Sequence, residues 1–192
     1  AYVLGVIVSD GCIQDYQLRI GVSDKDIQWL KGIRSLIGST HPIYERNDGT
    51  SLLCIGSKEL VDDLKNLGVI KNKTYDMTDI NIPTEYLNSF VLGFFDGDGN
   101  VTINTQKHRC GHKAIVISFI AHSEEFLKLL QEKINMSIKL DRGGVSYNHR
   151  SYILRYSGNR ISRIVADWMY ADSHICLDRK KNKIYNHLSS LL

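Results

Sequence analysis

A ten-residue pattern occurs twice in this chain, 88 positions apart. YVLGVIVSDG occupies residues 2 to 11, and FVLGFFDGDG occupies residues 90 to 99. Aligned without gaps, the two copies share a Val-Leu-Gly run and a final Asp-Gly pair. Self-similarity at a fixed spacing constrains the architecture strongly because it indicates a duplicated unit. The sequence therefore predicts two related halves, residues 1–82 and 83–192, with a junction marked by Pro83 together with Asn81 and Thr84.

Each copy is followed by the same order of segments. Residues 16–23 alternate apolar and polar side chains with the period of a half-buried strand. Residues 23–38 then have apolar side chains at helical spacing, with Ser23 and Asp24 as candidate caps. Residues 112–120 and 122–134 repeat this strand-helix order, and residues 50–68 correspond in the same way to residues 151–169. Each half is therefore expected to be an α+β unit of helix, strand pair, helix, strand pair and helix.

Composition excludes several classes of protein. The chain has 192 residues, 43% of them apolar, so it can bury a sizeable core without disulfide staples. Its four cysteines form no CxxC pair, which favours free thiols in a reducing compartment. It has no apolar run of about 18 residues and no charged leader, so we expect a soluble intracellular protein, with no membrane partner and the compartment undefined.

The positive charge lies in the second half. The net charge is only +3, but residues 1–88 hold 9 Lys+Arg against 12 Asp+Glu, whereas residues 89–192 hold 15 against 9. The overall charge alone does not indicate a nucleic-acid partner, but its distribution makes the second half the cationic one.

Both copies of the motif predict an apolar helix that ends in Asp-Gly. Glycine just past a helix end commonly supplies a left-handed conformation. Gly5 and Gly93 lie inside the expected helices, where glycine costs up to about 1 kcal/mol unless it permits close backbone approach. Such an approach between the two helices would bring Asp10 and Asp98 side by side at one end.

Two carboxylates in that position call for a cation. They repel each other, and each faces the negative end of its helix dipole. Oxygen ligands of this kind suit Mg²⁺, which can activate water in phosphodiester cleavage. The string DGDGN at 96–100 also resembles the start of a calcium loop, but Val101 and Lys107 occupy the positions that need glycine and glutamate. Metal-assisted hydrolysis is the chemistry that the pair favours.

VLGVIVSDG and VLGFFDGDG resemble the two motifs of the LAGLIDADG homing endonuclease family in its single-chain, double-motif form, and residues 151–180 also resemble family sequence. The resemblance implies two pseudo-symmetric αββαββα halves, with the motif helices at the interface and antiparallel sheets forming a DNA-binding saddle. It further implies a monomeric, site-specific double-strand DNA endonuclease that serves intron or intein mobility. Such an enzyme cuts a long, non-palindromic target across the minor groove and leaves 3′ overhangs. The implied cofactor is Mg²⁺, with Mn²⁺ able to substitute and Ca²⁺ binding without cleavage.

The family's metal-binding acids correspond here to Asp10 and Asp98, and the main-chain carbonyls of Ser9 and Gly97 are candidate additional ligands. The first motif departs from the family pattern because Val8 stands where the second motif has an earlier acid, Asp96. The family also places a basic residue beside each metal cluster. The candidates are Lys73 in the first half, and Arg179 or Lys180 in the second.

The DNA-facing surface follows from the alternation along the strands. Leu18, Ile20 and Val22 are expected to face the helices, as are Ile115, Ile117 and Phe119, and the intervening residues then face outward. Aligning the halves places Cys54 and Arg155 at equivalent outward positions. Polar outward residues suit base contacts, and basic residues near the connecting loops suit phosphate contacts. The candidate DNA-binding residues are Gln14, Gln17, Arg19, Tyr44, Arg46, Asn100, Thr102, Asn104, Gln106, Lys107, Lys113, Ser118, Arg142, Arg150 and Arg155.

Two other functions remain open at this point. A non-cleaving member of the same fold would act as an RNA-splicing maturase or as a DNA-binding regulator, although the presence of both motif acids favours the nuclease. A small-molecule enzyme could use Asp10 and Asp98 as an acid/base pair, but the polar and basic side chains expected on the sheets weigh against it.

Overall fold

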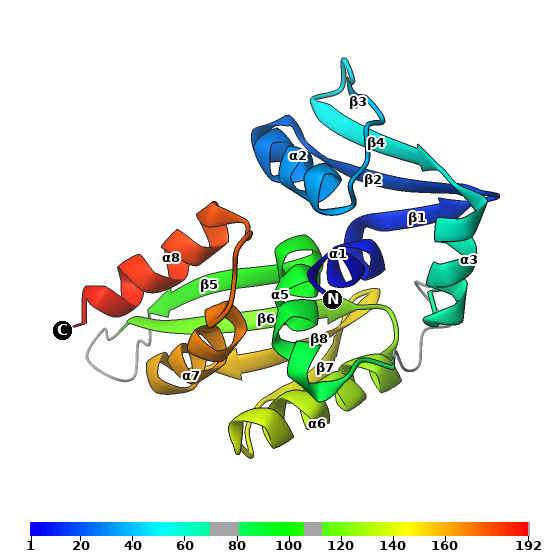
Figure 1. Cartoon of the computed structure of the whole chain (residues 1–192). Helices are drawn as coiled ribbons and strands as arrows, with labels where there is room; N and C mark the ends of the chain where they lie inside the picture. Colours follow the sequence, from blue (N-terminus) through cyan, green and yellow to red (C-terminus); the bar gives the residue numbers. More distant parts are fainter. Residues whose placement is uncertain (70–80, 106–112, 192) are drawn as a thin grey trace.

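The structure is a computed structural model that describes residues 1–69, 81–105 and 113–191. Two four-stranded antiparallel sheets lie on either side of a central helix pair, α1 and α5 (Figure 1). The α+β class and the repeated order of helices and strands predicted from the sequence are confirmed. No helix in the described ranges is long and apolar enough to cross a membrane.

The first half is built on a sheet of order β1-β2-β4-β3. Its elements are α1 (Tyr2–Asp10), β1 (Gly11–Gln14), β2 (Gln17–Ser23), the 3₁₀ helix η1 (Asp24–Asp26), α2 (Ile27–Leu36), β3 (Ile43–Glu45), β4 (Thr50–Gly56) and α3 (Lys58–Asn66). Leu18 and Ile20 of β2 are fully buried, and the alternate residues of the strand are more exposed. The predicted inward face of this strand is therefore confirmed.

The second half repeats this arrangement in the sheet order β5-β6-β8-β7. Its elements are η2 (Thr84–Tyr86), α5 (Leu87–Asp98), β5 (Gly99–Thr105), β6 (Lys113–Ala121), α6 (Glu124–Ile138), β7 (Gly144–Asn148), β8 (Ser151–Ser157), α7 (Asn159–Tyr170) and α8 (Asp178–Ser189). Ile115, Ile117 and Phe119 are fully buried, as the alternation predicted. Helix α8 contacts β5 and α7; it starts near the end of α5 and runs along β5, so that the C-terminus lies far from α1 (Figure 1).

Helix starts differ in detail from the sequence prediction. Ser23 makes no capping hydrogen bond, and Asp24 begins the short η1 rather than capping α2. The Asp24 carboxylate instead accepts a 2.6 Å hydrogen bond from the Ser51 hydroxyl of β4. Helix α6 begins at Glu124, capped by Ser123, whose hydroxyl accepts from the Phe126 N–H. The Asp24 carboxylate is therefore engaged by the neighbouring strand, whereas the cap of α6 is local.

The two motif helices touch through their glycines. A Cβ on Gly5 would lie 2.1 Å from the Phe90 carbonyl oxygen, and one on Gly93 would lie 2.0 Å from the Tyr2 carbonyl oxygen. Since main-chain atoms cannot move aside cheaply, only glycine fits at either position. The predicted reason for these two glycines, close backbone approach, is confirmed.

Candidate active site

Helices α1 and α5 both end at an aspartate that is followed by glycine, and both glycines are extended. Gly11 has φ −78° and Gly99 has φ −88°, so the left-handed conformation expected from the sequence is wrong. A Cβ would lie 2.5 Å from the Ile7 carbonyl oxygen at Gly11, and 2.3 Å from the Phe95 carbonyl oxygen at Gly99. Glycine is needed there for space, because each chain turns sharply from its helix into the first strand.

The end of each motif helix packs against the other motif. A Cβ on Gly97 would lie 1.9 Å from the Ser9 hydroxyl oxygen and 2.9 Å from Oδ2 of Asp10. Asp10 is half-buried and Asp98 is exposed. Burial lowers the pKa of Lys180, and the charges of Asp96, Asp10 and Asp98 oppose this effect, so acidic groups of both halves act on the same ammonium.

Lys180 caps the end of the second motif helix. Its Nζ donates to the carbonyl oxygens of Phe95, Asp96, Gly97 and Gly99 at 2.6 to 3.1 Å. An ammonium has three protons, so these four acceptors take its whole donor capacity. Burial lowers its pKa to about 8, an effect that the surrounding carboxylates oppose. Lys180 therefore supplies positive charge to the site while its hydrogen bonds go to the main chain.

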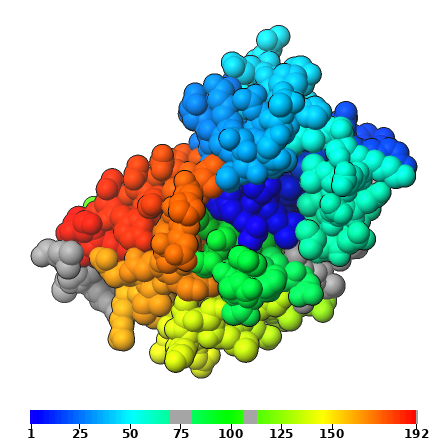
Figure 2. All heavy atoms as spheres, viewed as in Figure 1, coloured from blue at the N-terminus to red at the C-terminus, as the bar shows by residue number. Residues whose placement is uncertain are grey.

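Arg179, the neighbouring basic candidate, is exposed and bridges the two halves. Its Nε and Nη2 donate to the Asp26 carboxylate of η1, the shortest contact being 2.9 Å. The hydrogen bond to Asp26 is the main reason that the pKa of Arg179 is raised. Figure 2 shows the chain leading into α8, in orange, reaching the blue surface of the first half. The guanidinium is thus held in place with part of its surface open to solvent.

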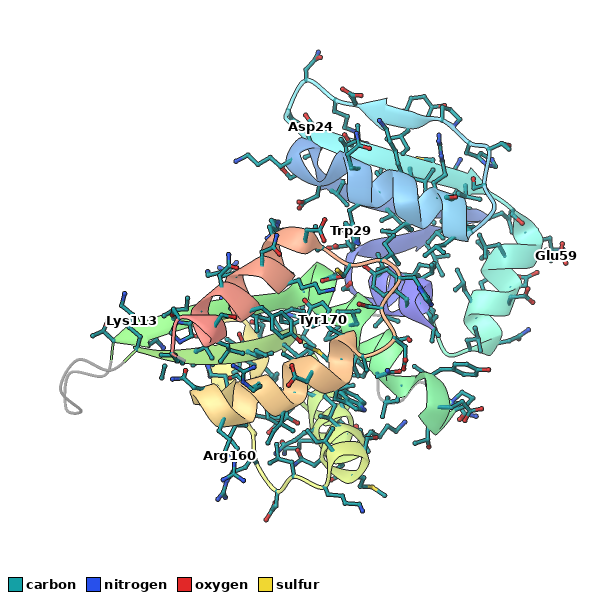
Figure 3. All side chains as sticks on the ribbon, turned by 60° about the vertical axis from the view of Figure 1, so that its left-hand side comes forward. Asp24, Trp29, Glu59, Lys113, Arg160 and Tyr170 are labelled. Carbon is teal, nitrogen blue, oxygen red and sulfur yellow. The ribbon has the colours of Figure 1, made fainter. Side chains whose placement is uncertain are left out.

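Asp96 lies behind this surface, buried to 2% exposure. Its Oδ2 accepts from the Tyr2 hydroxyl at 2.7 Å and from the Leu177 N–H at 2.9 Å. The Trp29 indole N–H in turn donates to the Tyr2 hydroxyl at 2.6 Å, and Trp29 lies on the underside of α2 (Figure 3). Burial raises the pKa of Asp96 to about 6, although these hydrogen bonds lower it.

Two cavities flank the motif ends. One of about 530 Å³ is lined by Asp10, Arg46 and Asp48 from the first half and by Asp96, Gly97 and Arg179 from the second. The other, about 350 Å³, is lined by residues of the second half that include Asn100, Arg179, Lys180 and Lys183. Arg179 and Gly97 line both. A larger cavity of about 750 Å³ lies between α2 and residues 173–181 and does not include Asp10 or Asp98.

The sheet registers place the candidate DNA-binding residues in matching rows. Arg19 pairs with Cys12 and Cys54, and Ser118 pairs with Asn100 and Arg155. The predicted equivalence of Cys54 and Arg155 is therefore confirmed, and the arginine stands on a different strand in each half. The remaining candidates are exposed or half-buried: Gln14, Gln17, Tyr44, Arg46, Thr102, Asn104, Lys113, Arg142 and Arg150.

One predicted DNA-binding residue is buried, and three predicted site residues lie outside the described ranges. Ser118 is 6% exposed, and its hydroxyl donates to the Asn100 carbonyl, so it presents little to a base edge. Lys73, Gln106 and Lys107 lie outside the described residues. Sequence reasoning missed Asp26, and it placed Arg46 only on the outer sheet face, although this residue also lines the Asp10 cavity. The described residues contain no cluster of three or more His, Cys, Asp or Glu able to hold a metal.

Comparison with known sequences finds proteins that are similar to part of this chain. No family model matches the chain. Reverse gyrase of Methanocaldococcus jannaschii is 28% identical over 98 residues, and that of Thermococcus kodakarensis is 23% identical over 117 residues, or 51% and 61% of this chain. These alignments cover only 6% of the length of either reverse gyrase.

Solved structures match nearly the whole chain. The LAGLIDADG meganuclease I-AabMI bound to uncleaved DNA superimposes with a TM-score of 0.69 at 10% identity, covering 99% of this chain and 88% of that one. The homing endonuclease I-GzeII in complex with its DNA target gives 0.69 at 12%, covering 98% and 88%. I-SmaMI, bound to uncleaved DNA in the presence of calcium ions, gives 0.68 at 12%, with the same coverage. The superpositions show a shared fold, and at identities this low they show the fold alone.

Proposed function

Because the chain has the LAGLIDADG homing endonuclease fold, with both motifs in one chain, we propose that it is a site-specific double-strand DNA endonuclease. One observation carries the proposal. The packed motif helices bring the carboxylate of Asp10 against Gly97, the residue before Asp98, and Lys180 donates to the carbonyls on either side of Asp98, at the edge where both sheets begin. The solved structures of the same fold described above include complexes with DNA targets.

A divalent ion fits the donor set at the motif ends. The carboxylates of Asp10 and Asp98 and the main-chain carbonyls of Ser9 and Gly97 are hard oxygen donors of the kind that Mg²⁺ prefers. The Gly97 carbonyl also accepts from Lys180 at 3.1 Å, so a bound ion would share this oxygen with the ammonium. A bound Mg²⁺ would lower the pKa of a water and stabilise the leaving oxygen. Mn²⁺ should replace it, and Ca²⁺ should bind without supporting cleavage.

The two basic residues have different roles in this proposal. Lys180 donates its hydrogen bonds to main-chain carbonyls, so its ammonium is fixed in position and would offset negative charge that develops on the phosphate. Arg179 uses two of its three nitrogens on Asp26, is exposed, and lines both cavities, so it is the group placed to contact a phosphate. The corresponding first-half candidate stays Lys73.

DNA would lie across both sheets. Outward Arg, Gln and Asn side chains on the strands suit base edges in the major groove, and the loop-borne basic residues suit phosphates. Because equivalent rows carry different side chains in the two halves, the target is expected to be non-palindromic and long. A monomer would then cut both strands across the minor groove, leave 3′ overhangs, and serve the mobility of an intron or intein.

The test is a cleavage selection. The protein is incubated with a randomised plasmid library and Mg²⁺, and the new ends are sequenced. We expect one long target with 3′ overhangs, whose cleavage is lost in Asp98→Asn and in Asp10→Asn. Glu59→Gln, an exposed acid on α3, is the matched control and should cut normally. Tight DNA binding without any cleavage in Mg²⁺ or Mn²⁺ would instead support the regulator or maturase function.

A further inference from the structure

The buried carboxylate of Asp96 belongs to only one of the two motifs. Val8 occupies the equivalent position in α1 and is 4% exposed. Burying a carboxylate is costly unless it is well hydrogen-bonded, and among the described residues Oδ1 of Asp96 has no partner. Because the Asp96 carboxylate is costly to bury and has no counterpart in the first motif, we looked to its hydrogen-bond partners for its function.

The partners of Asp96 indicate what that function is. Its Oδ2 accepts from the N–H of Leu177, the N-cap residue directly before α8. The Leu177 carbonyl accepts in turn from the N–H groups of Lys180 and Lys181. Asp96 therefore fixes the first turn of α8, which carries Arg179 and Lys180.

The same oxygen also joins this segment to the first half. Tyr2 of α1 donates to it, and Trp29 of α2 donates to Tyr2. Asp26, which holds Arg179, lies just before α2. The start of α8 is thus anchored twice, once beneath the surface through Asp96 and once on the surface through Asp26.

We propose that Asp96 is a positioning residue that holds the start of α8, and with it Arg179 and Lys180, against the end of the second motif helix. This inference rests on the proposed nuclease function. Because α8 belongs to the second half and the first motif has Val8 in place of the carboxylate, we expect the loss of Asp96 to slow the cut made beside α8 more than the cut on the other strand. The two cuts therefore differ in the residues that position the basic groups: Asp96 does so beside α8, and no equivalent carboxylate stands in the first motif.

A plasmid assay resolves the two cuts. With one target site in supercoiled DNA, the first cut gives nicked plasmid and the second gives linear plasmid. In Asp96→Val, which copies the first motif, we expect one strand to be cut roughly tenfold more slowly or worse, because small displacements of a catalytic group are expensive. Nicked plasmid then accumulates, and DNA affinity measured in Ca²⁺ is unchanged. Asp96→Asn, which keeps an acceptor oxygen, should restore part of the slow cut.

Val61→Ala is the matched control for stability. Val61 is fully buried in α3 and lines neither cavity at the motif ends, so loss of its side chain should leave the ratio of the two cutting rates unchanged. A general loss of stability would slow both cuts together. If Asp96→Val slows the two cuts equally, or neither, the proposal is overturned.

A second readout does not depend on cleavage. Hydrogen exchange in residues 174–181 should speed up in Asp96→Val, while exchange in β1, β2 and β4 stays unchanged. If the wild-type protein cuts no DNA, the proposed function fails, and this exchange measurement still decides whether Asp96 holds the segment. Unchanged exchange in residues 174–181 would overturn that contact's role.

Discussion

Gly5 and Gly93 set the distance between the two halves, because each lies against main-chain atoms of the opposite motif helix. Alanine at either position would have to push the helices apart. We expect Gly93→Ala to lower the free energy of unfolding by about 3 kcal/mol or more, the upper range for overpacking. Urea denaturation measures this loss. Gly144→Ala is the control, since a Cβ there meets nothing within 4 Å. Equal losses in the two variants would contradict the packing argument.

Cys176 is expected to be an unreactive thiol at neutral pH. Burial, with a further contribution from Asp96, raises its pKa to about 11. Since the thiolate is the reactive form, alkylation of Cys176 by iodoacetamide should rise about tenfold per pH unit between pH 7 and 10. Mass spectrometry of the alkylated peptides measures the rate, with the exposed Cys12 as internal comparison. A Cys176 rate that levels off below pH 9 would rule this out.

The repeated acids could be found from the sequence, and their partners could not. Asp10 and Asp98 stand out because the motif occurs twice. Arg179 and Asp26 are 153 residues apart, and Tyr2 and Asp96 are 94 apart. No local sequence pattern predicts such pairs. The sequence also could not separate the proposed roles of Arg179 and Lys180, which depend on the four carbonyls that surround Lys180. The extended conformation of Gly11 and Gly99 was also not predicted. A glycine required for space and a glycine required for a left-handed conformation are the same letter in the sequence.

The strands are the elements that the sequence predicted best. Period-two alternation identified the buried faces of β2 and β6, and aligning the repeats placed Cys54 and Arg155 in equivalent rows before any register was known. The start of α2 was predicted less well, since a tertiary hydrogen bond from Ser51 to Asp24 replaces the local cap. Alternation depends on neighbours along one strand, whereas the partner of Asp24 lies on another strand, 27 residues away in the sequence.

In the proposed function, Arg19 and Arg155 are two of the sheet residues expected to contact bases. Gln17 accepts from Nε and Nη2 of Arg19, and Ser146 accepts from Nη1 of Arg155 at 2.6 Å, so each guanidinium is held in place. They occupy equivalent rows on non-equivalent strands. We expect Arg19→Ala and Arg155→Ala to relax base preference at different target positions, one in each half-site, with a loss of about 1–3 kcal/mol of discrimination apiece.

Cleavage of a target library by each variant measures these preferences. Lys113→Ala is the control, because Lys113 is exposed at the end of β6 and is expected to contact a phosphate. This variant should weaken binding to all targets alike and reduce the salt dependence. If both arginine variants relax the same position, or none, the proposed reading of the two rows is wrong.

The two halves share one core and should unfold together. Buried residues of α1 and α5 belong to a single cluster with those of both sheets. The close glycine contacts and the Tyr2–Asp96 hydrogen bond also cross between the halves. Separating the halves would expose the apolar faces of both motif helices, which makes a state with one half folded costly. We therefore expect a single cooperative transition.

The two tryptophans allow each half to be followed separately. Trp29 lies in α2 of the first half and Trp168 in α7 of the second, and the chain has no others. In Trp168→Phe the fluorescence reports the first half, and in Trp29→Phe it reports the second. For each variant, the urea midpoint by fluorescence should coincide with the midpoint by far-ultraviolet circular dichroism, because loss of either half removes the support of the other. Trp29→Phe loses the hydrogen bond to Tyr2, so its midpoint should lie lower, yet the two probes should still agree. A fluorescence midpoint separated from the dichroism midpoint in either variant would mean that the halves fold independently.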